Sequence, residues 1–226
     1  MPIYQLSDDI VFPPAEHAEE DGLLAVGGDL DPARLLLAYG SGIFPWPHRG
    51  YPLLWFSPDP RMVLFPAELK VARSLRQVLS RKRFEIRYDT SFAEVMRQCG
   101  KVPRKGQKGT WITKPMLEAY TRLHELGHAH SAESWRDGKL VGGLYGVTLG
   151  RAFFGESMFA LEDDASKVAF VTLVRRIHEA GCTLIDAQVH TAHLARFGAR
   201  QIPRAEYMQH LQAALEGGAD TRIWPT

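Results

Sequence analysis

The stretch from residue 130 to residue 189 constrains the fold of this chain more than any other part of its sequence. Three strands are predicted in it, at residues 130–136, 140–148 and 152–159. Asp-Gly at 137–138 favours a hairpin between the first two strands. A helix should follow, with Ser166 as its N-cap and Gly181 after its end, and then a strand at 183–189. Strands separated by a helix are parallel neighbours, so the pattern indicates an α+β fold.

The remainder of the chain divides into two regions that differ in composition and in periodic pattern. Residues 1–61 are rich in Pro and Gly, with one short helix predicted at 32–39, where Asp31 can serve as the N-cap. The prolines of 42–47 exclude a central strand or a helix interior, which predicts a rigid loop that displays Trp46. More regular patterns follow, with helices expected at 71–79, 92–99, 115–127 and 203–215, another ending at residue 198, and a strand at 84–88. We therefore expect a small N-terminal α/β domain, 1–61, and a larger domain, 62–226.

Three polar residues fall on strands that are otherwise apolar. Residues two apart share one face of a strand, so Asp186 and Gln188 should project together, and so should Glu156 and Met158. If the two strands are neighbours, carboxylate and amide groups face each other across a short gap. Buried polar side chains are costly unless they are paired or functional. A structural network and a catalytic site are both compatible with this pattern. The order of the elements also fits the GNAT type of acyltransferase fold, in which two central parallel strands separate and open a cleft.

Charge is unevenly distributed along the chain. The segment from Lys70 to Lys108 holds 12 basic and 3 acidic residues and so carries +9, whereas the whole chain carries only +1. Such a segment is typical of a nucleic-acid-binding surface, although a solvated helix face and loop would have the same composition. Tyr39, Trp46 and Trp111 lie in or beside predicted loops, where aromatic rings can stack on exposed RNA bases.

Several classes of protein are disfavoured. No apolar stretch approaches the roughly 20 residues that a membrane span needs, and the N-terminus does not resemble a signal peptide. The two cysteines suggest a reducing cytoplasm. We expect no metal site at His124, His128 and His130, because the helix should end at residue 127 and leave them on different faces. Residues 161–165 contain three acids and no glycine, which disfavours a coenzyme A pyrophosphate site, and we expect no cofactor.

Nine ordered blocks carry a resemblance to a known family. They are GLLAVGGDL at 22–30, GIFPW at 42–46, WFSPDPR at 55–61, GTWIT at 109–113, GHAHS at 127–131, LVGGLYG at 140–146, GESMF at 155–159, ASK at 165–167 and LIDAQ at 184–188. Through them the chain resembles, nearly end to end, the bacterial leucyl/phenylalanyl-tRNA–protein transferases. The resemblance implies a GNAT-like domain that uses aminoacyl-tRNA in place of acetyl-CoA. It also implies transfer of Leu or Phe, with Met as a further candidate, to proteins that begin with Arg or Lys, which marks them for degradation by the N-degron pathway.

The resemblance also assigns residues by position. The catalytic residues would be Asp186, Gln188 and Glu156. The contacts to the aminoacylated adenosine would be Trp46, Trp111, Tyr39 and Tyr120, and the lining of the amino-acid pocket would be Met158, Leu173 and Ile177. From the basic segment we expect tRNA contacts at Arg73, Arg76, Arg81 and Lys82. A cytoplasmic monomer is expected. A CoA-dependent N-acetyltransferase and a non-catalytic RNA-binding module remain as alternatives.

Overall fold

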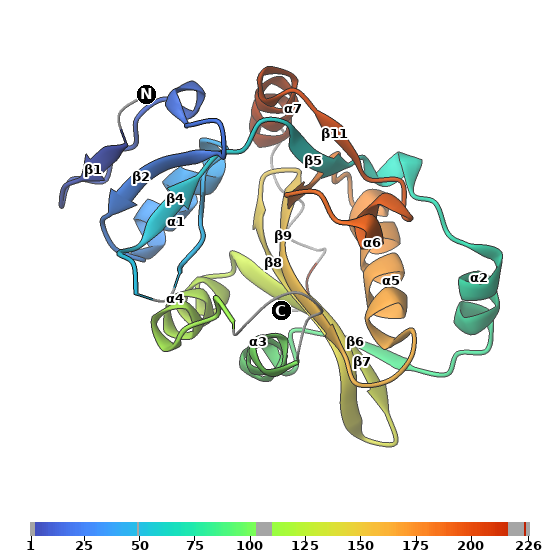
Figure 1. The fold of residues 1–226 in the computed structure, drawn as a ribbon. Helices are drawn as coiled ribbons and strands as arrows, with labels where there is room; N and C mark the ends of the chain where they lie inside the picture. The colour runs from blue at the N-terminus through green and yellow to red at the C-terminus, as the bar shows by residue number, and fades with distance from the viewer. Residues whose placement is uncertain (1–2, 49, 103–109, 217–223, 225–226) are drawn as a thin grey trace.

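Two β-sheets organise the chain in the computed structural model, which describes residues 3–48, 50–102, 110–216 and 224 (Figure 1). The smaller sheet belongs to the N-terminal part and has the order β1-β2-β4-β3. Its strands are β1 (Tyr4–Leu6), β2 (Leu23–Gly27), β3 (Phe44–Pro45) and β4 (Leu54–Phe56). A 3₁₀ turn, η1 (Ala15–His17), and helix α1 (Pro32–Gly40) complete this part.

Local chemistry explains how α1 begins and why β3 is short. The Asp31 side chain accepts a hydrogen bond from the backbone N–H of Ala33, and Pro32 occupies the first helical position, so the predicted cap is confirmed. The segment at 42–47 is not wholly a loop as predicted, since Phe44 and Pro45 pair with β4. They do so at the edge of the sheet, where a proline's missing N–H removes no ladder hydrogen bond.

The larger sheet has seven strands in the order β11-β5-β10-β9-β8-β7-β6. The strands are β5 (Arg61–Leu64), β6 (Glu85–Tyr88), β7 (Ala129–Arg136), β8 (Lys139–Leu149), β9 (Ala152–Ala160), β10 (Leu184–Gln188) and β11 (Arg200–Ile202). The hairpin predicted at 137–138, the α+β class and the parallel pairing of β10 with β9 are confirmed, and β8 and β9 form a second antiparallel pair. The change of sheet falls between β4 and β5, beside the boundary expected at residue 61, and the independence of the two parts as domains stays a prediction.

Helices cover both faces of this sheet (Figure 1). The helices of this part are η2 (Pro66–Glu68), α2 (Arg73–Ser80), α3 (Phe92–Lys101), α4 (Lys114–Glu125), α5 (Ala165–Glu179), α6 (Ala192–Ala195) and α7 (Arg204–Glu216), and α2 packs on α5. Neighbouring side chains on β9 enter opposite cores: Phe154 packs with α3, α4 and α7, and Phe153 packs with α5. Ser166 is not the N-cap of α5 as predicted, because Asp164 in a left-handed conformation precedes the helix and Ser166 is buried within it. None of the helices in the described residues is both long and apolar enough to cross a membrane.

Candidate active site

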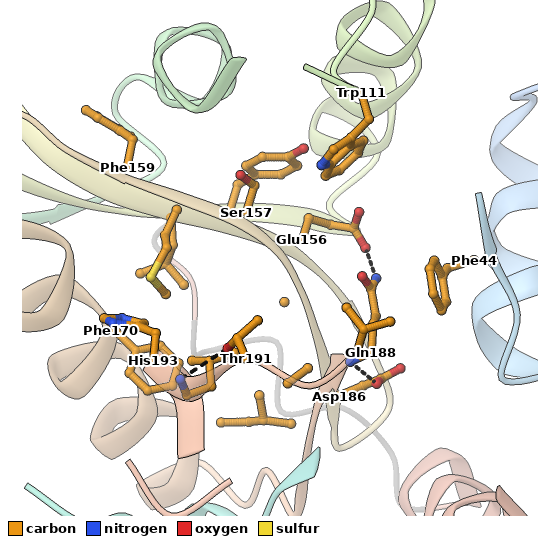
Figure 2. Close-up of a pocket in the computed structure, with 18 of the residues that line it drawn as sticks. Phe44, Trp111, Glu156, Ser157, Phe159, Phe170, Asp186, Gln188, Thr191 and His193 are labelled. Atoms are coloured by element: carbon orange, nitrogen blue, oxygen red, sulfur yellow. Dashed lines mark hydrogen bonds between the residues drawn. The ribbon is translucent and has the colours of Figure 1, made fainter. Parts of the chain in front are cut away.

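A cleft of about 1410 Å³ opens where β9 and β10 separate (Figure 2). The parallel ladder pairs Leu184 with Ala152 and ends with Asp186 opposite Phe154. Beyond that point β9 continues to Ala160, whereas β10 ends at Gln188 and pairs only with β5, so side chains occupy the gap between β9 and β10. The cleft is also bordered by 44–48 of the N-terminal part, by Thr110 and Trp111 ahead of α4, and by α5 and α6.

Glu156 and Gln188 bridge the gap between the separated strands. The amide nitrogen of Gln188 donates a 2.7 Å hydrogen bond to Oε1 of Glu156 (Figure 2). This contact is the one that the sequence predicted for a carboxylate and an amide on neighbouring strands. Because the amide nitrogen is committed to Glu156, the carbonyl oxygen of Gln188 remains as an acceptor on the cleft side.

Two buried tyrosines hold Glu156 from its other side. The Tyr39 hydroxyl donates to Oε1 of Glu156 at 2.7 Å, the Tyr120 hydroxyl donates to Oε2 at 3.4 Å, and the two hydroxyls also contact each other. Burial raises the pKa of Glu156 to about 7, against the hydrogen bonds from Tyr39 and Gln188, which lower it. Burial, followed by the charge of Glu156, raises the pKa of both tyrosines well above its ordinary value, so both remain donors.

Asp186 borders the cleft but is completely buried. Arg61 donates to both of its oxygens, from Nε to Oδ1 at 2.9 Å and from Nη2 to Oδ2 at 2.6 Å. The Tyr207 hydroxyl donates to Oδ2 at 2.9 Å, and the backbone N–H of Gln188 donates to Oδ1 at 2.8 Å. Four donors of the protein therefore bind the two oxygens of Asp186.

Gln188 has an unusual backbone conformation. Its φ is +62°, in the left-handed region that residues other than glycine seldom occupy, and the pairing of β10 with β5 shifts register between Asp186 and Gln188. The bond from its N–H to Asp186 holds this conformation. Strained residues of this kind occur where the surrounding structure fixes a functional side chain.

The predicted aromatic contacts divide into two pairs. Trp46 and Trp111 are half-buried and line the cleft. Tyr39 and Tyr120 are fully buried and direct their hydroxyls to Glu156, so neither ring offers a face on which a base could stack.

The predicted amino-acid pocket also differs in part from the structure. Met158 lines the cleft, together with Phe170 and Ser166 of α5, which the sequence analysis did not assign. Leu173 and Ile177 are buried in the core beneath α5 and do not line the cleft. The helix runs back from the open end of β9, so its later turns lie beside the part of the sheet where β9 and β10 are still paired.

The four predicted tRNA contacts are all exposed. Arg73 and Arg76 lie on α2, and Arg81 and Lys82 follow it. None of the four lines the cleft, and their role stays a prediction.

Two of the histidines considered in the sequence, His124 and His130, lie close to Asp89. In the described residues these three side chains come close enough for a metal ion, but three of the ring nitrogens have protein partners. Nδ1 of His130 bonds Asp89 at 2.7 Å, its Nε2 contacts the carbonyl of Gly127 at 3.1 Å, and Nδ1 of His124 contacts the carbonyl of Ala129 at 2.8 Å. These bonds account for the group as part of the fold.

Comparison with known proteins gives consistent matches. The sequence model described as leucyl/phenylalanyl-tRNA protein transferase matches residues 63–212, and the model of the N-terminal domain of the same family matches residues 28–59. The chain is 59% identical over 218 residues to the leucyl/phenylalanyl-tRNA–protein transferase of Myxococcus xanthus, covering 96% of this chain and 93% of that protein. It is 58% identical over 214 residues to the enzyme of the same name from Syntrophotalea carbinolica, covering 95% and 93%.

Among solved structures, the C-terminal domain of a putative lysylphosphatidylglycerol synthetase from Agrobacterium fabrum is similar at a TM-score of 0.45 and 13% identity. That alignment covers 87% of this chain and 73% of the other. A likeness at this level supports no conclusion about function.

Proposed function

The chain belongs to the leucyl/phenylalanyl-tRNA–protein transferase family, and from this premise we propose that its cleft joins the aminoacyl group of leucyl- or phenylalanyl-tRNA to the N-terminal amine of an acceptor protein. The observation that carries the proposal is the hydrogen bond between Glu156 and Gln188 across the separated strands, beside an apolar recess. The same separation of two parallel strands supports a GNAT-like fold for the larger part of the chain.

The donor would occupy the two chemically different parts of the cleft. The side chain of Leu or Phe fits the apolar recess lined by Met158, Phe170 and Ile185. Burial of such a side chain contributes about 1.5–3 kcal/mol. Trp46 and Trp111 border the same cleft, where their rings can pack on the terminal adenosine of the tRNA. Tyr39 and Tyr120 would act through Glu156 instead of touching the adenosine.

The acceptor amine would meet the ester next to Gln188. The carbonyl oxygen of the Gln188 amide can accept an N–H of the amine and direct its lone pair to the ester carbonyl carbon. A new C–N bond forms, the bond from that carbon to the ribose oxygen breaks, and this oxygen leaves as a hydroxyl group. The ester is already activated, so no nucleotide triphosphate is required, and positioning alone can supply several kcal/mol.

The α-ammonium group of the acceptor protein must lose a proton before its nitrogen attacks the ester, because a free α-ammonium group has a pKa of roughly 8. Asp186 is not accessible to the amine, since it is fully buried, pairs with Arg61 and accepts bonds from four protein donors. Glu156 is better suited, because burial raises its pKa to about 7, close to that of the amine. A second proton passes from the attacking nitrogen to the departing ribose oxygen, which balances the reaction.

We also propose that the acceptors begin with Arg or Lys. With Asp186 neutralised, Glu156 is the negative group of this bridge that can attract a cationic side chain. Transfer would mark such proteins for degradation by the N-degron pathway. We place the reaction in the cytoplasm and expect a monomer. The two cysteines, Cys99 and Cys182, are buried and form no disulfide in the described residues.

A transfer assay with labelled leucyl-tRNA tests the proposal. It uses two peptides that differ only in their first residue, which is Arg in one and Ala in the other. Label should pass to the peptide that begins with Arg and not to its partner. Equal transfer to both would contradict the acceptor preference, and no transfer to either would overturn the proposed function. A titration with acetyl-CoA serves as the control for the alternative donor, and binding of acetyl-CoA would favour an N-acetyltransferase.

A further inference from the structure

Arg61 is a positive charge enclosed beside the cleft. It is the first residue of β5, and only 1% of it is exposed. Besides its two bonds to Asp186, its Nη1 donates to the carbonyl oxygen of Gly42 at 3.1 Å. Its guanidinium group lies 4.8 Å from the centre of the Phe44 ring and 4.6 Å from that of Tyr207. These hydrogen bonds and ring contacts together fix the position of the guanidinium group.

The bonds continue from Arg61 to the cleft without a break. Arg61 fixes both oxygens of Asp186, Asp186 fixes the backbone N–H of Gln188, and the Gln188 amide meets Glu156. The strained backbone of Gln188 is held by this bond to Asp186 and by its pairing with Met62 of β5. A carboxylate free to rotate would weaken the first of these two supports.

We propose that Arg61 is a positioning residue for the transfer reaction, which acts through Asp186 to present the Gln188 amide to the acceptor amine. The inference rests on the proposed function and assigns Arg61 and Asp186 to orientation and not to proton transfer. Tyr207 assists, since its hydroxyl donates to the same carboxylate and its ring packs on the guanidinium.

The geometry requires arginine and not simply a positive charge. A guanidinium group presents several N–H donors in one plane, so it can bind two carboxylate oxygens and a carbonyl at once. The ammonium group of lysine keeps the charge but cannot reproduce this pattern. Arg61→Lys should therefore loosen Asp186 without leaving it unpaired.

A second buried arginine supplies the matched control. Arg34 is fully buried and pairs with Asp29 at 3.2 Å, and it also donates to backbone carbonyls at 7–9. It does not line the cleft. Arg34→Lys makes the same chemical change at a second buried arginine, whose partner Asp29 is exposed, away from the reacting groups.

The experiment compares the wild-type chain with Arg61→Lys, Tyr207→Phe and Arg34→Lys. Titration with a stable amide analogue of leucyl-adenosine counts the binding-competent sites in each preparation and gives the Kd. Transfer from leucyl-tRNA to a peptide beginning with Arg then gives kcat per competent site. Arg61→Lys should lower this kcat by about 10-fold to 100-fold, since a misplacement of 1 Å has an effect of that order. The Kd of the analogue should change by less than about threefold.

The other variants separate positioning from stability. Tyr207→Phe removes one hydrogen bond to Asp186 and should lower kcat about fivefold, and it carries the test if Arg61→Lys does not fold. Arg34→Lys should reduce only the number of competent sites. An unchanged kcat per competent site in Arg61→Lys or, where that variant does not fold, in Tyr207→Phe overturns the positioning role while the proposed function stands. A wild-type chain that binds the analogue but transfers nothing overturns both.

Discussion

At the scale of single residues, the protonation of Glu156 links stability to pH. Its pKa is about 7 in the folded chain and 4.5 in its ordinary state. The folded chain therefore holds its proton more tightly than the unfolded chain does. The stability that this preference contributes is fully present below pH 4.5 and is lost as the pH rises through 7.

Replacement of Glu156 by Gln should remove this dependence, because an amide does not ionise. Between pH 5 and pH 8.5 the free energy of unfolding of Glu156→Gln should rise relative to the wild type by up to about 3 kcal/mol. Urea denaturation at the two pH values measures the difference. Glu118→Gln, at an exposed position of α4, serves as the control and should follow the wild type. Equal offsets for Glu156→Gln at both pH values would contradict the raised pKa.

Substitutions of Asp186 should affect both the stability of the fold and the rate of transfer, and the two effects can be measured separately. In Asp186→Ala the buried Arg61 loses its partner, which typically lowers stability by about 3–5 kcal/mol. Loss of the support for Gln188 should also lower turnover by about 100-fold or more. Asp186→Asn keeps the shape and the acceptor oxygen, so it should recover part of the turnover. Full activity of Asp186→Ala at a temperature where it is folded would remove Asp186 from the mechanism.

At the scale of elements, the position along α5 decides which residues form the recess. Residues 166, 170, 173 and 177 recur at helical spacing and share one stripe of the helix. The strands beneath this stripe are separated only at the end where α5 begins. Phe170 therefore faces the cleft, and Leu173 packs on the closed sheet.

Alanine substitutions at these two positions should have different effects. Phe170→Ala enlarges the recess and should shift the ratio of Phe to Leu transfer by about tenfold in favour of Phe. Leu173→Ala should lower stability by about 2–5 kcal/mol, as buried leucines do, and leave the ratio within twofold. Competition between leucyl- and phenylalanyl-tRNA measures the ratio, and thermal unfolding measures stability. A larger shift of the ratio in Leu173→Ala would show that Leu173 lines the amino-acid pocket.

The elements also explain what the sequence could and could not predict. Regular periodicity and glycine turns were sufficient for the β7, β8 and β9 hairpins and for α5. They were insufficient for β5 and β11, which have four and three residues and no pattern long enough to recognise. β5 carries Arg61, whose partner Asp186 lies 125 positions away. The spacing of residues along the strands was enough to predict that Glu156 and Gln188 meet. The contact of Arg61 with Asp186 depends on the pairing of β5 with β10, which the sequence did not predict.

At the scale of the whole molecule, positive charge is concentrated in one segment of a nearly neutral sequence. The net charge is +1, and the segment from Lys70 to Lys108 carries +9. Arg73, Arg76, Arg81 and Lys82 belong to this segment and are exposed on and after α2. Figure 1 places α2 on the far side of α5 from the N-terminal part. A tRNA whose 3′ end enters the cleft would have to extend around α5 to reach them.

The dependence of tRNA binding on salt tests this arrangement. Each phosphate that a basic side chain neutralises contributes about 0.7–0.9 to the slope of log K against log salt concentration. If all four side chains contact phosphates, replacing them with Gln should lower the slope by about 3. A control variant with Gln at Arg122, Lys139, Arg175 and Arg200 makes the same change in net charge at exposed positions outside the segment. Equal slopes in the two variants would show that the four residues act only through overall charge, and would place the phosphate contacts nearer the mouth of the cleft.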